Sequence, residues 1–301
     1  MSKLPILLVA KDKALYFLPS IDSLDVISGK DLLDPVYFNF FHPKLKEYEL
    51  IVFLDYGFET EIAAKIRPYT TAKIVLYFWN HLKEEEHFRM IQQAQNESAV
   101  DEIYHFDRIE AQKLGLRHNS SFYSKKMKIP QVEVTSDLFF GATDNGRKEL
   151  AESYRKEFEQ RGLTTNYYIL PSRGNEQANY LSYADYLALT AQSQGILELM
   201  RAGQKGVTLR TFESSFFEKK LVTDNEAIKS YYFYNPQNIF LLQERNLDEL
   251  PEFLHSPFQP VDPNILNFFD VNNWAQRFLW LDKVEWLDKV DFEKYEYHKE
   301  D

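Results

Sequence analysis

The stretch Gln204–Asn225 (QKGVTLRTFESSFFEKKLVTDN) holds the residue types and spacing best suited to binding phosphate. A turn with Gly206 lets the backbone approach a ligand closely, and the predicted helix after it offers free N–H groups and the positive end of its dipole. Thr208 can cap this helix, and Arg210 adds a planar cation for bidentate phosphate contact. Glu213 lies one turn further on, about the reach of a ribose diol if a diphosphate binds at the helix start. The alternative is an ordinary capped helix, since many α/β proteins have such a turn.

Short apolar runs alternate with charged amphipathic runs along the chain, and this predicts strands separated by helices. The predicted strands have no polar alternation, which is typical of parallel sheets buried on both faces. In the first half they are Ile6–Ala10, Leu50–Leu54, Lys73–Phe78 and Glu102–Phe106. In the second half they are Asp137–Phe140, Thr165–Leu170, Gly195–Met200, Lys220–Thr223 and Asn238–Leu242.

The sequence therefore predicts an α/β protein with two Rossmann-like domains facing a central cleft. A chain of 301 residues suits two such domains. The polar, aperiodic segment 117–136 predicts the interdomain linker. We therefore expect domains at 1–125 and 126–270, followed by a helical tail at 271–301.

The tail combines an aromatic helix with a short repeat. Trp274, Phe278 and Trp280 are spaced to form a helix that packs back onto the first domain. The pentapeptide WLDKV occurs twice, at Trp280–Val284 and Trp286–Val290. Its period of six fits neither a helix nor a heptad, so we interpret it as a short duplication or a chance repeat.

Composition and missing motifs exclude several protein classes. The chain has no cysteine, which excludes disulfides, thiolate metal sites and cysteine nucleophiles. A net charge of −11 without a basic tract argues against nucleic-acid binding. The apolar run Ile6–Ala10 is too short for a signal peptide, and no run approaches the roughly 20 apolar residues of a membrane helix. Walker, GxGxxG, HExxH and GxSxG motifs are missing, and the histidines lack metal-ligand spacing.

Several stretches together resemble a known family. They are Lys73–Asn80 (KIVLYFWN), Tyr104–Asp107 (YHFD), Phe139–Gly141 with Gly146-Arg147 (FFG…GR), Tyr183–Leu187 (YADYL), Gly203–Glu213 (GQKGVTLRTFE), Lys219–Asn225 (KKLVTDN) and Tyr231–Asn238 (YYFYNPQN), with Trp274 as a late member. The chain resembles GT-B glycosyltransferases. More closely, it resembles the bacterial glycosyltransferases of lipopolysaccharide and capsular polysaccharide biosynthesis. The block from 203 to 238 is the most specific part.

The resemblance implies that the second domain holds a nucleotide-sugar donor and the first an acceptor glycan. By position, Glu213 resembles the glutamate that holds the ribose. Gly206, Thr208 and Arg210 resemble the cradle of the diphosphate. The expected donor-binding residues are Gly141, Arg147, Gln204, Lys205, Gly206, Thr208, Leu209, Arg210, Glu213 and Asn225.

Two features refine this expectation. Gly141 and Arg147 lie where the loop after the first strand of the second domain faces the donor phosphates. Many retaining GT-B enzymes carry a second glutamate eight residues before the ribose glutamate, and this chain has Lys205 there. Retaining and inverting outcomes both stay open, and Lys205 could instead stabilise a leaving diphosphate. Neither metal nor cofactor is expected beyond the nucleotide sugar, for which a UDP-sugar is the first choice.

An inverting enzyme needs a base to deprotonate the acceptor hydroxyl. Candidates follow strands of the first domain, where α/β sites form: Asp12, Asp55, and the Asn80-His81 corner. Of these we predict His81, Asn80 and Asp55 as catalytic, with a solvated loop residue as the alternative for each. Asp107 has a similar position, but a helix N-cap explains it equally well.

The sequence thus predicts a glycosyltransferase that moves a sugar to a glycan or lipid-linked acceptor in bacterial surface polysaccharide biosynthesis. Residues 1–130 are near neutral, with 17 basic and 18 acidic residues, and so form the better half for an anionic acceptor. One alternative is a GT-B-like sugar-nucleotide epimerase. Another is a non-catalytic GT-B-like protein that binds a glycan or a subunit. We expect a cytoplasmic protein that can associate peripherally with the inner membrane face, although no basic amphipathic helix supports this.

Overall fold

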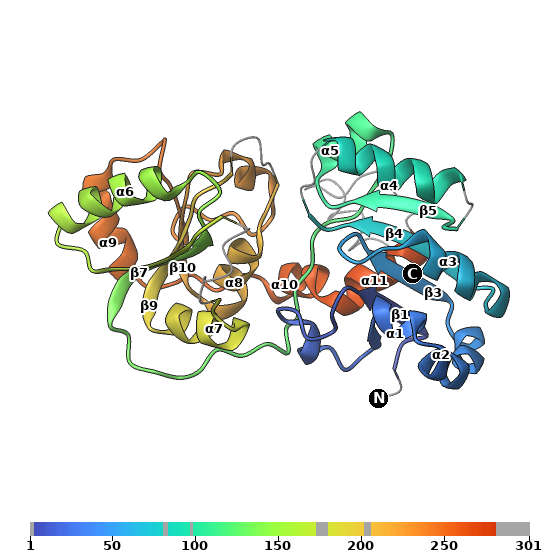
Figure 1. The fold of residues 1–301 in the computed structure, drawn as a ribbon. Helices are drawn as coiled ribbons and strands as arrows, with labels where there is room; N and C mark the ends of the chain where they lie inside the picture. The colour runs from blue at the N-terminus through green and yellow to red at the C-terminus, as the bar shows by residue number, and fades with distance from the viewer. Residues whose placement is uncertain (1–2, 81–83, 97–98, 173–179, 202–205, 281–301) are drawn as a thin grey trace. The chain divides into compact units, whose positions relative to one another are not determined.

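The computed structural model describes residues 3–80, 84–96, 99–172, 180–201 and 206–280 (Figure 1). The chain divides into two compact units. The first unit comprises Met1–Lys126 together with Phe268–Asp301, and the second unit comprises Met127–Asn267. The units change after residues 126 and 267, and the sequence analysis expected domain boundaries at 125 and 270. The cleft expected between the domains stays a prediction.

Six parallel strands form the sheet of the first unit, in the order β2-β1-β3-β4-β5-β6. They are β1 (Ile6–Ala10), β2 (Asp25–Ser28), β3 (Leu50–Leu54), β4 (Lys73–Phe78), β5 (Glu102–His105) and β6 (Arg117–His118). In the central register, Leu8 of β1 lies between Val26 and Val52. Because all the strands run in parallel, their carboxyl ends lie at one edge of the sheet.

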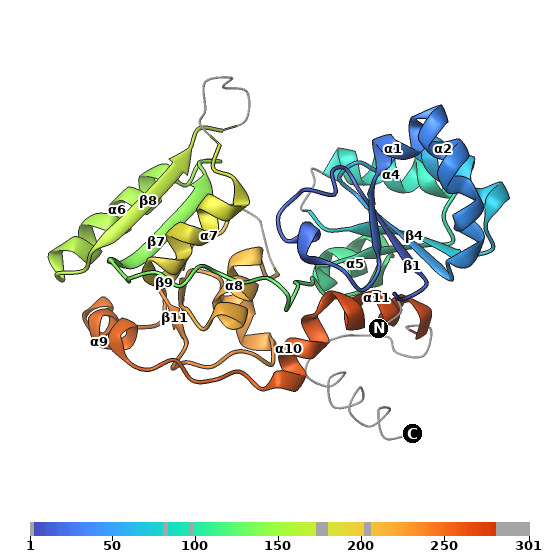
Figure 2. The same cartoon turned by 90° about the horizontal axis from the view of Figure 1, so that it is seen from below.

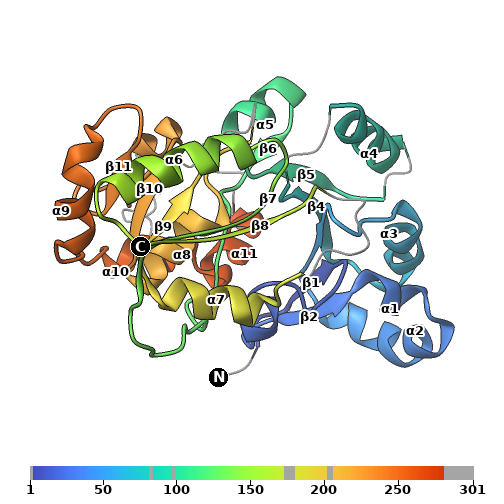
Figure 3. The ribbon, with the colours of Figure 1, turned by 60° about the vertical axis from the view of Figure 1, so that its left-hand side comes forward.

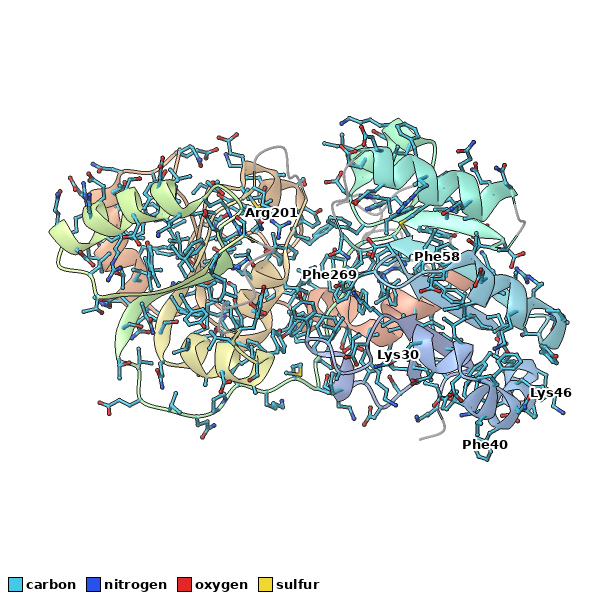
Figure 4. All side chains as sticks on the ribbon, in the orientation of Figure 1. Lys30, Phe40, Lys46, Phe58, Arg201 and Phe269 are labelled. Atoms are coloured by element: carbon cyan, nitrogen blue, oxygen red, sulfur yellow. The ribbon has the colours of Figure 1, made fainter. Side chains whose placement is uncertain are left out.

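Helices that connect the strands cover one face of this sheet. They are α1 (Gly29–Leu33), α2 (Pro35–Phe41), α3 (Thr60–Ile66) and α4 (Glu84–Asn96) (Figure 2). One apolar cluster joins Val9 and Phe53 of the sheet to Leu32, Phe38 and Ile62 of the helices. Such burial is the main favourable term in folding. On the outer side of α2, Phe40 projects from the unit (Figure 4).

The opposite face is covered by α11 (Val271–Trp280), which follows the second unit in sequence but belongs to the first. Trp274 of α11 is fully buried, and its ring stacks on Phe122 with 3.7 Å between ring centroids. The same indole meets Tyr77 of β4 edge-on at 5.1 Å. Phe278, one turn further along the helix, contacts Tyr104 of β5 at 4.8 Å. This aromatic layer closes the second face of the sheet.

A buried arginine fixes α11 on the segment that follows β6. Arg277 donates hydrogen bonds to Asn119 Oδ1 at 2.9 Å and to Ser120 Oγ at 2.7 Å. It also donates to the carbonyl of Phe268 and lies 4.1 Å from the centroid of that ring. Because a buried cation is costly unless its donors are satisfied, these contacts make the position of α11 specific.

The second unit contains a five-stranded parallel sheet in the order β11-β10-β9-β7-β8 (Figure 3). Its strands are β7 (Ser136–Thr143), β8 (Thr165–Leu170), β9 (Ser193–Glu198), β10 (Lys220–Thr223) and β11 (Ile239–Leu241). Its main helices are α6 (Lys148–Gln160), α7 (Tyr183–Ala191), α8 (Leu209–Phe217) and α9 (Leu250–His255). Phe158 of α6 and Phe253 of α9 share a cluster with Phe140 and Leu197 on one face. Helix α7 lies on the opposite face from α6 (Figure 3).

The remaining elements are shorter connections. They are α5 (Arg108–Leu114), α10 (Pro263–Phe269) and the 3-10 helices η1 (Leu18–Ser20), η2 (His42–Glu47), η3 (Arg67–Tyr69), η4 (Glu226–Ser230) and η5 (Leu247–Glu249). None of the helices in the described ranges is long and apolar enough to cross a membrane. Asp107 caps α5 by accepting from the N–H groups of Ile109 and Glu110, so the N-cap interpretation of Asp107 is confirmed.

Some elements differ from the sequence-based expectation. The strands β2 and β6 and the helices α1 and α2 were not predicted. The start of the predicted linker 117–136 is structured, because β6 pairs with β5 and Tyr123 pairs with Asp270. Residues 281–301, with most of the WLDKV repeat, lie outside the described residues.

We expect Trp274→Ala to lower the free energy of unfolding by about 3–5 kcal/mol, because it leaves a cavity in the aromatic layer under the first sheet. Leu279→Ala, at a half-exposed position on the same helix, should change it by less than about 0.5 kcal/mol. Urea unfolding followed by circular dichroism measures both. Equal effects of the two variants would contradict the proposed packing of α11.

Candidate functional site

The carboxyl edge of the second sheet has the topology that favours ligand binding. The chain runs from β7 outward to β8, and then crosses back to β9 on the other side of β7. In open α/β sheets, ligands bind at such a reversal, beyond the carboxyl ends of the strands. The reversal lies between β7 and β9, and α8 begins at the same edge of the sheet.

The turn before α8 is held in place by its neighbours. Gly206 has a φ of 76°, a left-handed conformation that favours glycine. Its carbonyl accepts a hydrogen bond from Asn225 Nδ2 at 2.7 Å. Thr208 is the N-cap of α8, and its hydroxyl accepts from the N–H of Arg210 at 3.1 Å. The cap that the sequence predicts is therefore confirmed, with Leu209 as the first helical residue.

A buried carboxylate that the sequence analysis missed organises this edge. Glu198, at the end of β9, accepts hydrogen bonds from the hydroxyls of three threonines. Thr208 comes from the turn, Thr211 from α8 and Thr223 from the end of β10. Burying a carboxylate is costly unless it is hydrogen-bonded, so the three donors tie these segments together. The available signal was a single acid in the apolar strand GILELM.

Three arginines gather at the switch between β7 and β9. Arg147 is buried and donates to the carbonyls of Leu199 at 2.7 Å and Thr143 at 2.6 Å. Burial, together with the positive charges of Arg210 and Arg201, lowers the pKa of Arg147 to about 10. Three cations that repel one another at one sheet edge are a favourable setting for an anion.

The three guanidinium groups differ in what they can offer. Arg147 is committed to backbone carbonyls and acts mainly as a fixed charge. Arg210 donates to the carbonyl of Gly141, while its Nε is buried with no hydrogen-bond partner in the described part of the chain. Arg201 is exposed (Figure 4), with the Asn145 amide oxygen 3.1 Å from its Nη2 when that amide faces it. Arg210 is thus the cation with an unsatisfied buried donor.

Glu213 is not open to solvent. It is 1% exposed, and its two carboxylate oxygens accept from Tyr183 Oη at 2.7 Å and Tyr186 Oη at 2.9 Å. Burial raises the pKa of Glu213, while the two hydroxyl bonds and the charge of Arg210 oppose that rise. A ribose diol could bind the carboxylate directly only by displacing a tyrosine hydroxyl. Tyr183 and Tyr186 are a second feature that the sequence analysis did not assign to the site.

The position of Tyr186 explains the glycine at the end of β7. A side chain at Gly141 would lie 2.7 Å from the ring of Tyr186 and 2.7 Å from that of Phe139. Tyr186 in turn lies parallel to Tyr183, with an interplanar angle of 8° and 5.9 Å between centroids. Only a glycine therefore allows the tyrosine pair to lie over the strand that carries the Arg210 contact.

The structure brings most of the predicted donor-binding residues to one edge of the second sheet. They are Gly141, Arg147, Gly206, Thr208, Leu209, Arg210, Glu213 and Asn225. Gln204 and Lys205 lie outside the described residues. Within the ranges that the structure describes, no group of three or more His, Asp or Glu side chains is placed to hold a metal ion.

The predicted catalytic residues belong to the first unit. Asp55 follows β3 and is 4% exposed. Its carboxylate accepts from the backbone N–H of Asn80 at 3.0 Å, from Asn80 Nδ2 at 3.0 Å and from the N–H of Tyr56 at 2.7 Å. Asp55 and Asn80 are therefore paired, and Asp55 orders the chain after β4. His81 lies outside the described residues.

Comparison with known proteins supplies no assignment. No model of a known protein family matches the chain, and the search of curated proteins finds no match. The two doubly wound parallel units and the geometry of their sheet edges therefore carry the functional argument.

We expect the Asp55 carboxyl to titrate near pH 6, because burial raises the pKa of Asp55 to about 6 against hydrogen bonds that lower it. Asn80→Ala removes one of those bonds and should raise this pKa further, whereas Asn39→Ala on α2 should leave it unchanged. Carboxyl NMR titration measures all three. Since the folded state then holds the proton more tightly than the unfolded state, the free energy of unfolding should fall as pH rises from about 4 to about 6. A midpoint near 4 would contradict this environment.

Proposed function

We propose that the chain is a glycosyltransferase of GT-B type, which transfers a sugar from a nucleotide-sugar donor to a saccharide or lipid-linked acceptor. The observation that carries the proposal is the convergence of Arg147, Arg201 and Arg210 on the capped start of α8, at the switch point of the second sheet. The sequence resemblance of the 203–238 block to that class supports the same assignment.

The chemistry of this edge suits a diphosphate. The N–H groups of the first turn of α8 and its dipole favour a doubly charged group. Arg210 supplies a planar cation with a buried, unsatisfied Nε donor. In glycosyl transfer the bond from the sugar carbon to the diphosphate oxygen breaks, and negative charge grows on that oxygen. Fixed donors and cations stabilise the developing charge without reorganising.

The tyrosine pair gives the nucleoside end of the proposed site. Each hydroxyl donates its proton to Glu213, and a phenolic oxygen can also accept a hydrogen bond, such as one from a ribose hydroxyl. Glu213 then orients the two acceptors rather than binding the diol itself. In this proposal position 213 still serves ribose binding, as the resemblance implies, but Tyr183 and Tyr186 make the contact with the ribose.

A second candidate is a non-catalytic protein that binds a nucleotide or glycan. It is favoured by the state of Asp55, whose oxygens are engaged by three N–H groups. An acceptor-dependent release of UDP from a UDP-sugar, assayed with a panel of oligosaccharides, separates the two candidates. Binding of nucleotide without release under any acceptor would favour the second.

Arg210→Gln should abolish the thermal stabilisation of the protein by its nucleoside diphosphate, with affinity falling about ten- to hundred-fold because a charge-assisted hydrogen bond is lost. UDP, GDP, CDP, CMP and dTDP are the ligands to screen. Arg155→Gln is the matched control, since Arg155 lies on the exposed side of α6 and pairs with Glu159. Equal stabilisation of both variants would refute the placement of the diphosphate.

Glu213→Gln should weaken UDP more than it weakens pyrophosphate, because it disturbs the tyrosine hydroxyls of the nucleoside end. Arg210→Gln should weaken both ligands alike. Calorimetric titration of the two variants with the two ligands gives the comparison. If Glu213→Gln weakened both ligands equally, Glu213 would act on the diphosphate rather than on the ribose.

A further inference from the structure

The first sheet has a reversal of its own, in a different unit from the proposed donor site. From β1 the chain goes outward to β2 and then crosses to β3 on the other side of β1. The loops after β1, β3 and β4 therefore meet beyond the carboxyl edge, where ligands of open α/β sheets bind. None of the described donor-binding residues belongs to this unit.

Aromatic side chains gather at this second switch point. Tyr16 follows β1 and is 46% exposed, and Tyr56 follows β3 and is 38% exposed. Trp79 follows β4, meets Tyr16 edge-on at 6.0 Å, and stacks on the buried Phe122 at 5.4 Å. Aromatic rings with exposed area and a polar group suit the face of a sugar ring, which is apolar where its C–H bonds align and polar at its rim.

The backbone around these rings is unusually constrained. Tyr16 has a φ of 48°, a left-handed conformation that is unfavourable for a non-glycine residue. Gly57 has a φ of 101°, and a side chain there would lie 2.5 Å from the Cα of Lys11. The close approach at Gly57 places Tyr56 beside Lys11. Backbone strain of this kind persists only where the surrounding structure enforces it, and it is frequent at ligand-binding sites.

Two polar groups complete the edge. Lys11 donates to Tyr56 Oη at 2.8 Å, and its ammonium lies 4.1 Å from the centroid of that ring. An ammonium group has three donors, so Lys11 can serve the hydroxyl and an anion together. Asn80 is exposed, and it donates its backbone N–H and one side-chain N–H to Asp55, which turns its amide oxygen toward a position where it can accept from a hydroxyl.

We propose that Tyr16, Trp79, Tyr56, Lys11 and Asn80 form a binding subsite for an acidic saccharide, with the sugar ring against the aromatic side chains and its acid group on Lys11. Saccharide binding at this subsite does not depend on the assignment of the donor site. Its role as the acceptor subsite rests on the proposed function. Asp55 is then a positioning residue that aims the amide of Asn80.

The test measures dissociation constants by ligand-observed NMR for methyl glucuronide, glucose 6-phosphate and neutral methyl glucoside. Tyr16→Ala should weaken the acidic ligands about tenfold or more, while Tyr69→Ala should not, since Tyr69 has a matching exposure of 44% but precedes β4 at the other edge of the sheet. Lys11→Met should remove the preference for acidic over neutral sugar, and Lys13→Met should keep it.

Each outcome decides one part of the proposal. A stronger response to glucuronide than to the sugar phosphate identifies a carboxylate as the acid group, and the reverse identifies a phosphate. Absence of saccharide binding, or loss of it in Tyr69→Ala as much as in Tyr16→Ala, would overturn the subsite. Thermal shift with UDP on the same samples separates the two claims, because UDP binding without saccharide binding leaves the donor site standing.

Discussion

A single buried carboxylate sets the arrangement of the second unit at its functional edge. Glu198 ends β9 inside an apolar strand, where an ionised group without partners would be prohibitively costly. The hydroxyls of Thr208, Thr211 and Thr223 meet that cost only when the turn, the helix and the neighbouring strand are all in place. These three hydrogen bonds therefore fix the position of the start of α8. Arg210 lies in the first turn of α8, so they fix its position as well.

The same logic separates the residues that hold the site from those that can touch a ligand. Arg147 and Asn225 bind backbone carbonyls, so they shape the loops and contribute charge or rigidity. In the described part of the chain, Arg210 keeps an Nε donor without a hydrogen-bond partner. In the first unit, Asp55 holds the side chain of Asn80 in position, and Asn80 is the residue that can contact a ligand. At both sheet edges, a buried polar group thus holds a less buried one in position.

The sequence predicted the features that depend on residues close together in the chain, such as buried strands and helix caps. The strands Ile6–Ala10 and Leu50–Leu54 were predicted at the bounds observed, because buried parallel strands are continuous apolar runs. The cap at Thr208 was predicted from residue type alone. The strand Asp25–Ser28 was missed because it is short and two of its four residues, Asp25 and Ser28, are polar. Glu198 with its threonines and Glu213 with Tyr183 join segments far apart in sequence, which no local period reveals.

The helix α11 lies at the end of the sequence but completes the first sheet. During synthesis, the strands of the first unit leave the ribosome while their aromatic face still lacks Trp274 and Phe278. At about 5–20 residues per second, the roughly 150 residues that follow Tyr123 take many seconds to appear. The second unit is therefore synthesised in full before α11, which covers the first sheet. The aromatic face of the first sheet therefore stays uncovered until the second unit has been synthesised, and exposed apolar surface of this kind favours aggregation.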